Sequence, residues 1–283
     1  MKFILFFLIA AGPLFGFSQN LHVDIFGGIA NYQGDLQGKR LDIKQSKPAI
    51  GLGLSYDLSN KFIVRTGFTY GTVMGDDKKN TTAKGVAERN LNFKSAVAEL
   101  HLGLEYNLFN LEERSFTPYV FAGVAGFHFN PYTKDLAGNK FFLQPLSTEG
   151  QGLAAYPERK EYKLTQFSIP FGGGVKFKLS DDLQIGVEMG LRKLFTDYLD
   201  DVSNVYADQN ILLNAKGAKS VELAFRGDEI NSNAPYPSNG DQRGNAKSKD
   251  FYYFSGIKIS KRINSNGGSS RGSNKTGCPR SVF

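Results

Sequence analysis

Residues 93–108 read FKSAVAELHLGLEYNL, and this stretch decides the fold because apolar and polar side chains alternate along it. One face carries Ala96, Ala98, Leu100, Leu102, Leu104 and Tyr106. The opposite face carries Glu99, His101 and Glu105. In a membrane-spanning strand, each charge turned to lipid would cost up to about 2–4 kcal/mol near the bilayer midplane. The pattern therefore predicts a transmembrane β-strand whose charged face points into a barrel.

Seven further stretches alternate in the same way, and each reaches the ~9–11 residues that a tilted strand needs to cross a bilayer. An apolar outside with a polar inside is the reverse of a soluble, ligand-carrying barrel. We therefore predict an all-β fold, an eight-stranded antiparallel transmembrane β-barrel with long outer loops, short periplasmic turns and a flexible C-terminal tail. The predicted strands span residues 21–32, 48–58, 61–74, 93–108, 116–129, 163–179, 182–196 and 251–263.

The connections between these strands alternate in length, which orients the barrel. Outer-membrane barrels have short periplasmic turns and long outer loops, and an even number of strands places both termini in the periplasm. We therefore expect a protein of the cell outer membrane, in contact with outer-membrane lipids, with both termini periplasmic. The short links are residues 58–60, 109–115 and 180–181, and the long ones are residues 33–47, 75–90, 130–162 and 197–250.

The two ends of the chain differ in character from the barrel. Residues 1–18 are typical of a signal peptide, with a positive start at Lys2, a short apolar run and small residues before Gln19. Residues 19–263 then form the barrel, and residues 264–283 form a flexible periplasmic tail. The formal net charge of +7 suits anionic lipid heads or acidic partner surfaces, whereas nucleic acid is not an expected partner after export.

Charged inward positions on the predicted strands are expected to pair inside the barrel. Eight strands enclose an interior just wide enough for side chains to fill, which argues against a porin. We therefore expect a packed polar network instead of a channel lining. Its members are Arg65, Glu99, His101, Glu105, Lys176, Glu188 and Arg192.

The sequence shows no convincing catalytic or metal site. His22, His101 and His128 are all predicted to point inward, but at different heights, so they do not form one site. The acidic residues Asp197, Asp200 and Asp201 could share a calcium ion, yet solvated loop carboxylates are the favoured interpretation. We therefore predict no enzyme activity, no cofactor and no bound metal.

The last long loop and the tail are expected to behave differently. Residues 210–225 are apolar enough to fold partly over the barrel or to meet a partner, while residues 238–249 are predicted to be mobile.

The tail carries the only cysteine, Cys278, followed by Pro279 and Arg280, after a Gly/Ser/Asn linker able to span ~30 Å or more. An intermolecular disulfide in the oxidising periplasm is favoured over a chance free thiol.

Three segments carry a family resemblance. Gly28-Ile-Ala-Asn-Tyr32-Gln-Gly34-Asp35-Leu36 ends the first strand, Thr196-Asp-Tyr-Leu-Asp-Asp201-Val-Ser follows the seventh, and Cys278-Pro279 lies in the tail. Together they resemble the PorG-like barrels of Bacteroidetes type IX secretion systems. The resemblance implies a non-enzymatic anchor of a periplasmic ring built of a PorK-like lipoprotein and a PorN-like partner. It also implies that Cys278 would bond with a cysteine of the lipoprotein.

Two alternatives stay open at this level. The first is an outer-membrane surface binding protein or enzyme that acts through its long extracellular loops. The second is a small channel, which would show as conductance of the purified barrel in a planar bilayer.

Overall fold

The structure is a computed structural model that describes residues 20–37, 43–80 and 86–263. The predicted signal peptide, residues 1–18, lies outside the described residues. The predicted tail, residues 264–283, also lies outside them, together with Cys278, Pro279 and Arg280. Both segment boundaries therefore stay predictions.

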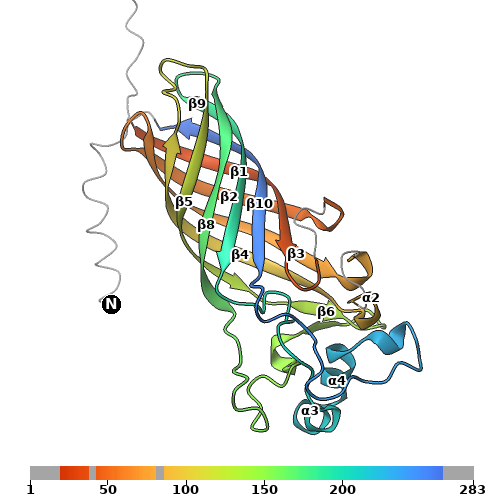
Figure 1. The fold of residues 1–283 in the computed structure, drawn as a ribbon. Coiled ribbons are helices and arrows are strands. Elements are labelled where there is room, and N and C mark those ends of the chain that lie inside the picture. The colour runs from red at the N-terminus through yellow and green to blue at the C-terminus, as the bar shows by residue number, and fades with distance from the viewer. Residues whose placement is uncertain (1–19, 38–42, 81–85, 264–283) are drawn as a thin grey trace, which may run out of the picture.

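In the described part of the chain, eight long strands close into an antiparallel barrel, which confirms the predicted fold (Figure 1). Their order around the wall is β3-β2-β1-β10-β9-β8-β5-β4, and β3 also pairs with β4, so the ring is closed. The wall strands are β1 (Leu21–Gln33), β2 (Lys47–Asp57), β3 (Phe62–Asp76), β4 (Asn92–Asn107), β5 (Phe116–Phe129), β8 (Thr165–Lys178), β9 (Leu183–Leu194) and β10 (Phe251–Arg262).

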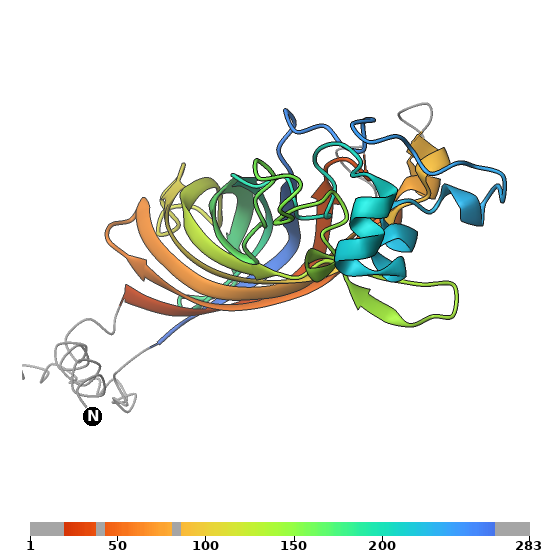
Figure 2. The ribbon, with the colours of Figure 1, turned by 90° about the horizontal axis from the view of Figure 1, so that it is seen from below.

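The shorter elements gather at one end of the barrel, which we call the loop end (Figure 2). The opposite end, with the links at residues 58–61, 108–115 and 179–182, is the turn end. The β6–β7 hairpin adds two short strands beside β4 at the loop end. The short elements are β6 (Tyr132–Lys134), β7 (Lys140–Phe142), α2 (Val86–Arg89), α3 (Gln209–Lys216), α4 (Ala218–Ala224) and the 3-10 turns η3 (Ile43–Gln45), η4 (Asp77–Lys79), η5 (Gln144–Leu146) and η6 (Gly227–Glu229).

The outer face of the wall is apolar and the inner face is polar, as the alternation predicts. Leu100 on β4 is 63% exposed, and Ile50 on β2 is 66% exposed. Glu99 and Glu105, on the other face of β4, are fully buried. Antiparallel closure leaves each wall strand paired on both sides, so the backbone polar groups of the wall are satisfied within the sheet.

Two centres of opposite charge fill much of the interior. In the first, Arg65 donates to both carboxylate oxygens of Glu188, at 2.7 and 2.9 Å, and the Tyr119 hydroxyl donates to Glu188 at 2.8 Å. The neighbouring Glu105 accepts hydrogen bonds from Lys176 and, at 3.3 Å, from Lys258. The positive side chains thus neutralise the two buried carboxylates.

The second centre lies around Glu99. Arg192 donates to Glu99 at 2.9 Å, and the Tyr252 hydroxyl donates to it at 2.6 Å. His101 Nδ1 lies 3.6 Å from the same carboxylate. The structure therefore brings the seven expected interior residues into two adjoining clusters, and it adds Tyr119, Tyr252 and Lys258, which the sequence reasoning had left out.

Little space remains between these side chains. An interior cavity lined by Arg65, His101, Glu188 and Arg192 among others has a volume of about 30 Å³. This is about the share of one molecule in liquid water. The interior is a packed core and offers no wide path along the barrel axis.

The Arg65–Glu188 pair provides a test of this core. Glu188→Ala should destabilise the barrel by about 3–5 kcal/mol, because it removes the bidentate partner of a buried guanidinium. The double variant Arg65→Met/Glu188→Leu removes both charges and should recover a large part of that loss. Urea unfolding of the barrel in lipid vesicles, followed by circular dichroism, measures both. A double variant that is less stable than Glu188→Ala would contradict the interpretation.

Candidate functional site

Two of the sequence motifs, far apart in the chain, meet at the loop end. The Tyr32 hydroxyl, at the end of β1, donates to Asp200, in the segment after β9, and lies 3.5 Å from Asp250. Its ring packs edge-on against Phe93, with centroids 4.9 Å apart. Leu36 is buried beside it. The motif residues therefore join the first and last long loops to the rim of the wall.

The glycines of the first motif allow close approach of neighbouring groups. A Cβ atom on Gly34 would lie 2.0 Å from an Asp250 oxygen and 2.1 Å from the Tyr32 hydroxyl. A Cβ on Gly28 would lie 2.2 Å from the carbonyl oxygen of Ser255 on β10. These glycines thus serve packing of the wall and the loops, and they do not form a ligand site by themselves.

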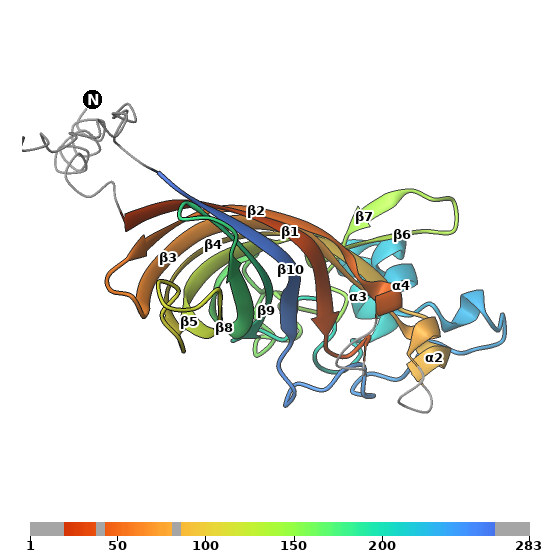
Figure 3. The same ribbon diagram turned by 90° about the horizontal axis from the view of Figure 1, so that it is seen from above.

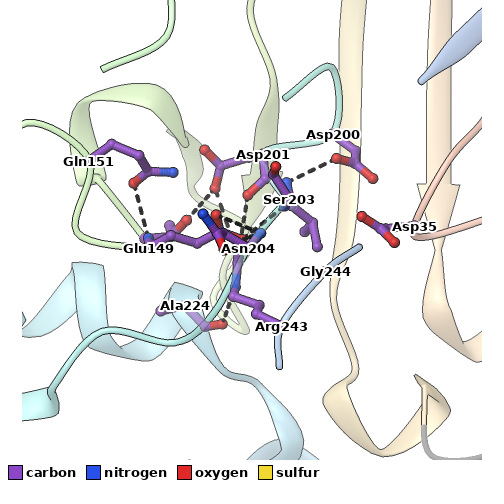
Figure 4. A network of polar contacts seen from close by, with 12 residues as sticks. Asp35, Glu149, Gln151, Asp200, Asp201, Ser203, Asn204, Ala224, Arg243 and Gly244 are labelled. Carbon is purple, nitrogen blue, oxygen red and sulfur yellow. Dashed lines mark hydrogen bonds and ion pairs between the residues drawn. The ribbon is translucent and has the colours of Figure 1, made fainter. Parts of the chain in front are cut away.

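A buried ionic centre holds the loops together (Figure 4). Arg243 donates to Glu149 at 3.0 Å, to the Asp201 carbonyl at 2.6 Å and to the Ala224 carbonyl at 3.1 Å. Glu149 also accepts the backbone N–H groups of Ser203 at 2.9 Å and of Asn204 at 3.0 Å. Arg243, Glu149 and Asp201 are each at most 2% exposed.

Arg89 of α2 ties the two remaining loops to this centre. It donates to the Asp77 carboxylate at 2.8 Å, to the Asp35 carbonyl at 3.1 Å and to the Arg243 carbonyl. The Asp35 carboxylate in turn accepts the backbone N–H of Asn245 at 3.0 Å. All four long loops are thereby joined, and we call their described residues, 34–37, 43–46, 77–80, 86–91, 130–164 and 195–250, the loop cap.

The structure of the loop cap contradicts the prediction for residues 238–249 and gives the conformation of residues 210–225. Residues 238–249 were predicted to be mobile, but the structure anchors them through buried Arg243 and through a bridge between Val205 and Gln242. Residues 210–225 form α3 and α4, which bury Leu212 and Leu223 in the cap. The composition of residues 238–249 concealed this anchoring because the contacts are made by one arginine side chain and by backbone groups, which leave no signal in the sequence.

The acidic residues after β9 have separate hydrogen-bond partners, and they are buried instead of solvated as predicted. Asp197 accepts from the Ser203 hydroxyl at 2.8 Å, while Asp201 accepts from Thr148 at 2.5 Å and from Tyr162 at 2.7 Å. Within the described ranges, no group of three or more His, Cys, Asp or Glu side chains is arranged to hold a metal ion.

Burial changes the acidity of these loop carboxyls. Loss of solvation raises the pKa of Asp197 to about 7, against the lowering effects of the Ser203 hydroxyl and Lys249. Loss of solvation also raises the pKa of Asp201 to about 6, although Arg243 acts in the opposite direction. The same cause raises the pKa of Asp200 and of Asp250 well above its ordinary value.

The three histidines lie apart, and one prediction about them is wrong. His22 lies 2.9 Å from Asp57 near the turn end, and His101 lies beside Glu99 in the interior. His128 was predicted to point inward, but it is exposed on the outer face, where Nδ1 lies 2.9 Å from the Thr165 hydroxyl. Its neighbours Phe127 and Phe129 take the inward positions of β5 and are buried.

An open cleft of about 1330 Å³ lies at the edge of the loop cap. Residues of the cap such as Asp35, Arg89 and Phe225 line it on one side. Gln33, Leu191 and Phe251 of the wall line it on the other. The sequence reasoning missed this cleft because it forms only when the first, second and last long loops come together.

A model of the family described as "Domain of unknown function (DUF6089)" matches residues 1–216. The chain belongs to this family. The matched part contains the first two motifs and the strands from β1 to β9. No curated protein matches the chain.

Several solved structures are similar to this DUF6089 family member. The Ail attachment invasion locus protein of Yersinia pestis, in complex with the heparin analogue sucrose octasulfate, has a TM-score of 0.40 at 9% identity, over 86% of this chain and 97% of that chain. Neisserial surface protein A has a TM-score of 0.40 at 8% identity, over 86% and 96%. The outer membrane protein OprG from Pseudomonas aeruginosa has a TM-score of 0.41 at 12% identity, over 86% and 96%.

The distribution of side chains over the barrel places it in a membrane. A closed antiparallel wall with an apolar outer face and a buried ionic interior has the properties of an outer-membrane barrel. Among the described helices, none combines the length and the apolar character needed to cross a bilayer. The protein is therefore an outer-membrane β-barrel protein.

Arg243 should be essential for order in the loop cap. Arg243→Ala leaves the Glu149 carboxylate buried without its counter-charge, and such a loss costs about 3–5 kcal/mol. We expect faster hydrogen–deuterium exchange in residues 195–250 and 130–164, while the wall strands keep wild-type protection. Lys247→Ala, at an exposed position of the same segment, is the control. Unchanged exchange in the Arg243 variant would refute the role assigned to this residue.

Asp197 should make the stability of the loop cap depend on pH. Because its pKa is higher in the folded protein than in the unfolded chain, its contribution is complete below pH ~4 and is lost as the pH rises toward ~7. Asp197→Asn should remove this loss, which amounts to at most about 4 kcal/mol, and keep an acceptor for Ser203.

The measurement is hydrogen–deuterium exchange of residues 195–250 between pH 5 and pH 8, comparing wild type and variant at each pH. We expect the two proteins to diverge as the pH rises, with the variant better protected. Asp241→Asn, at an exposed position of the same loop, is the matched control. Parallel profiles of wild type and Asp197→Asn would rule out this dependence.

Proposed function

We propose that this protein is a non-enzymatic outer-membrane anchor of a type IX secretion machine that docks, and tethers by a disulfide, a periplasmic lipoprotein ring. The observation that carries the proposal is the packed ionic interior of the barrel. A wall filled by the Arg65–Glu188 and Arg192–Glu99 pairs suits a rigid support, since it leaves no room for a translocating chain. Such a support exerts its function through surfaces and attached segments.

The resemblance to PorG-like barrels supports the choice of machine. The motif residues Tyr32 and Asp200 contact each other, so the two motifs form one unit of the fold. The partners proposed on this basis are a PorK-like lipoprotein and a PorN-like ring protein. Strand β10 ends at Arg262, beside His22, at the turn end. In this proposal the turn end faces the periplasm, and the segment with Cys278, Pro279 and Arg280 belongs to the side of these partners.

The tether has a direct test in cells. Wild-type protein should migrate on a non-reducing gel as a larger species that reductant converts to the monomer, and Cys278→Ser should abolish this species. Ser273→Ala, in the same segment, is the control and should keep it. The larger species should contain the lipoprotein on mass-spectrometric analysis. Persistence of the same species in Cys278→Ser would exclude the covalent tether.

A second candidate function is binding of a ligand at the cell surface through the long loops. The observation that favours it is the open cleft of about 1330 Å³ at the edge of the loop cap. Two deletion variants distinguish the two proposed functions. Shortening the loop between β9 and β10 should abolish surface binding alone, whereas removal of residues 264–283 should abolish the anchoring alone.

A further inference from the structure

The floor of the cleft belongs to the outer surface of the barrel. Gln33 on β1 pairs with Phe251 on β10, and both line the cleft together with Leu191 on β9. Their neighbours Tyr32, Tyr252 and Arg192 point into the interior and are buried. Because side chains alternate along a strand, Gln33, Phe251 and Leu191 face away from the lumen. The cleft therefore lies outside the barrel, at the loop end.

Many of the cap residues of the cleft come from the segment that leads into β10. This segment runs past α2 at the loop end (Figure 3). The cleft is bounded there by polar side chains, including Asn231, Asp241, Gln242 and Asn245. Amide and carboxylate groups of this kind donate and accept hydrogen bonds with hydroxyl groups. This side of the cleft is thus suited to a polyhydroxylated group.

The floor of the cleft meets the apolar belt along β9, where the outward side chains lead from Leu191 through Met189 to Val187. Farther from the loop end on the same three strands, the outward side chains are Ile29 on β1, Ile257 on β10 and Val187 on β9, which are 38%, 48% and 60% exposed. A molecule in the cleft can therefore keep an apolar part against the wall and a polar part among the cap residues. This is the arrangement that an amphiphile of the bilayer requires.

Two exposed lysines lie near Phe251 at the floor of the cleft. Lys249 lines the cleft and is exposed. Lys193 is exposed on β9, where it pairs with Phe251. The arginines at the cleft, Arg89 and Arg243, already donate to protein groups. Lys249 donates to the Ala246 carbonyl at 3.0 Å, but an ammonium carries three N–H donors, so Lys249 and the exposed Lys193 can still meet a negatively charged headgroup.

We propose that this cleft binds an anionic, sugar-bearing lipid of the outer leaflet, with its acyl chains against Leu191 and Phe251 and its headgroup between the lysines and the loop cap. The proposal takes the loop end to face the outside, as long loops indicate. It rests on the second proposed function, binding through the loops, and is independent of the anchor. The volume of about 1330 Å³ exceeds the ~300–1,000 Å³ of typical small-molecule pockets, as an extended ligand requires.

The test uses the full mature protein in detergent micelles with lipid A as the probe. Native mass spectrometry should show a one-to-one complex for wild type. The double variant Lys193→Ala/Lys249→Ala should weaken this complex about tenfold or more. Lys261→Ala, an exposed lysine at the opposite end of β10, is the matched control and should bind as wild type does. Leu191→Asn, which keeps the charges, should also weaken the complex.

Four results would overturn the proposal. The first is equal lipid A binding by wild type and the double variant. The second is an equal loss in Lys261→Ala, which would mean unspecific charge attraction. The third is equally tight binding of glucosamine 1-phosphate, which has no acyl chain and would indicate a soluble ligand. Phosphatidylglycerol, an anionic lipid without sugar, should bind at least tenfold more weakly, and equal binding would refute the sugar requirement. The Cys278-dependent species on non-reducing gels should be unchanged in all variants, so failure here leaves the anchor untouched.

Discussion

The rest of the structure depends on one constraint, which is that hydrocarbon accepts neither a free backbone hydrogen-bonding group nor an unpaired charge. Closure of β3 on β4 and of β1 on β10 satisfies the backbone. The apolar outward faces of the strands contact the hydrocarbon without placing charges in it. Since every second residue must then point inward, the charged positions of the wall accumulate in the interior. The ionic pairs around Glu99, Glu105 and Glu188 are the consequence, and they occupy the space that a pore would need.

Beyond the bilayer the same chain must build a second core without a sheet. The loop cap does this by using buried carboxylates as acceptors for backbone N–H groups that lack a strand partner. Glu149 receives two such groups, and Asp35 receives the N–H of Asn245. Arg243 and Arg89 supply the balancing positive charge, and they donate hydrogen bonds to backbone carbonyl groups of the loops. Asp35 and Glu149 therefore have a structural role in the loops as acceptors for backbone N–H groups.

Alternation along single strands was enough to predict the wall, because burial on one face leaves a signal of period two in each segment. It also predicted that Arg65, Glu99 and Glu188 face inward. The same reasoning failed for His128, where two phenylalanines beside it resembled outward residues but fill the interior near the loop end. The contacts of the loop cap could not be predicted from the sequence, for a different reason. Tyr32 and Asp200 are 168 positions apart, and nothing local marks either as the partner of the other.

The seam between β1 and β10 also constrains how the protein is made. The first wall strand, β1, pairs with β2 on one side, and on the other side it pairs with the last strand, β10, over a register that runs from His22 to Gln33. Until β10 is synthesised, both β1 and β9 present an open edge, which lipid does not tolerate. The wall therefore cannot close until the final strand is available. A chain that lacks β10 leaves both edges unpaired, so the position of the seam makes closure of the whole wall depend on the last strand.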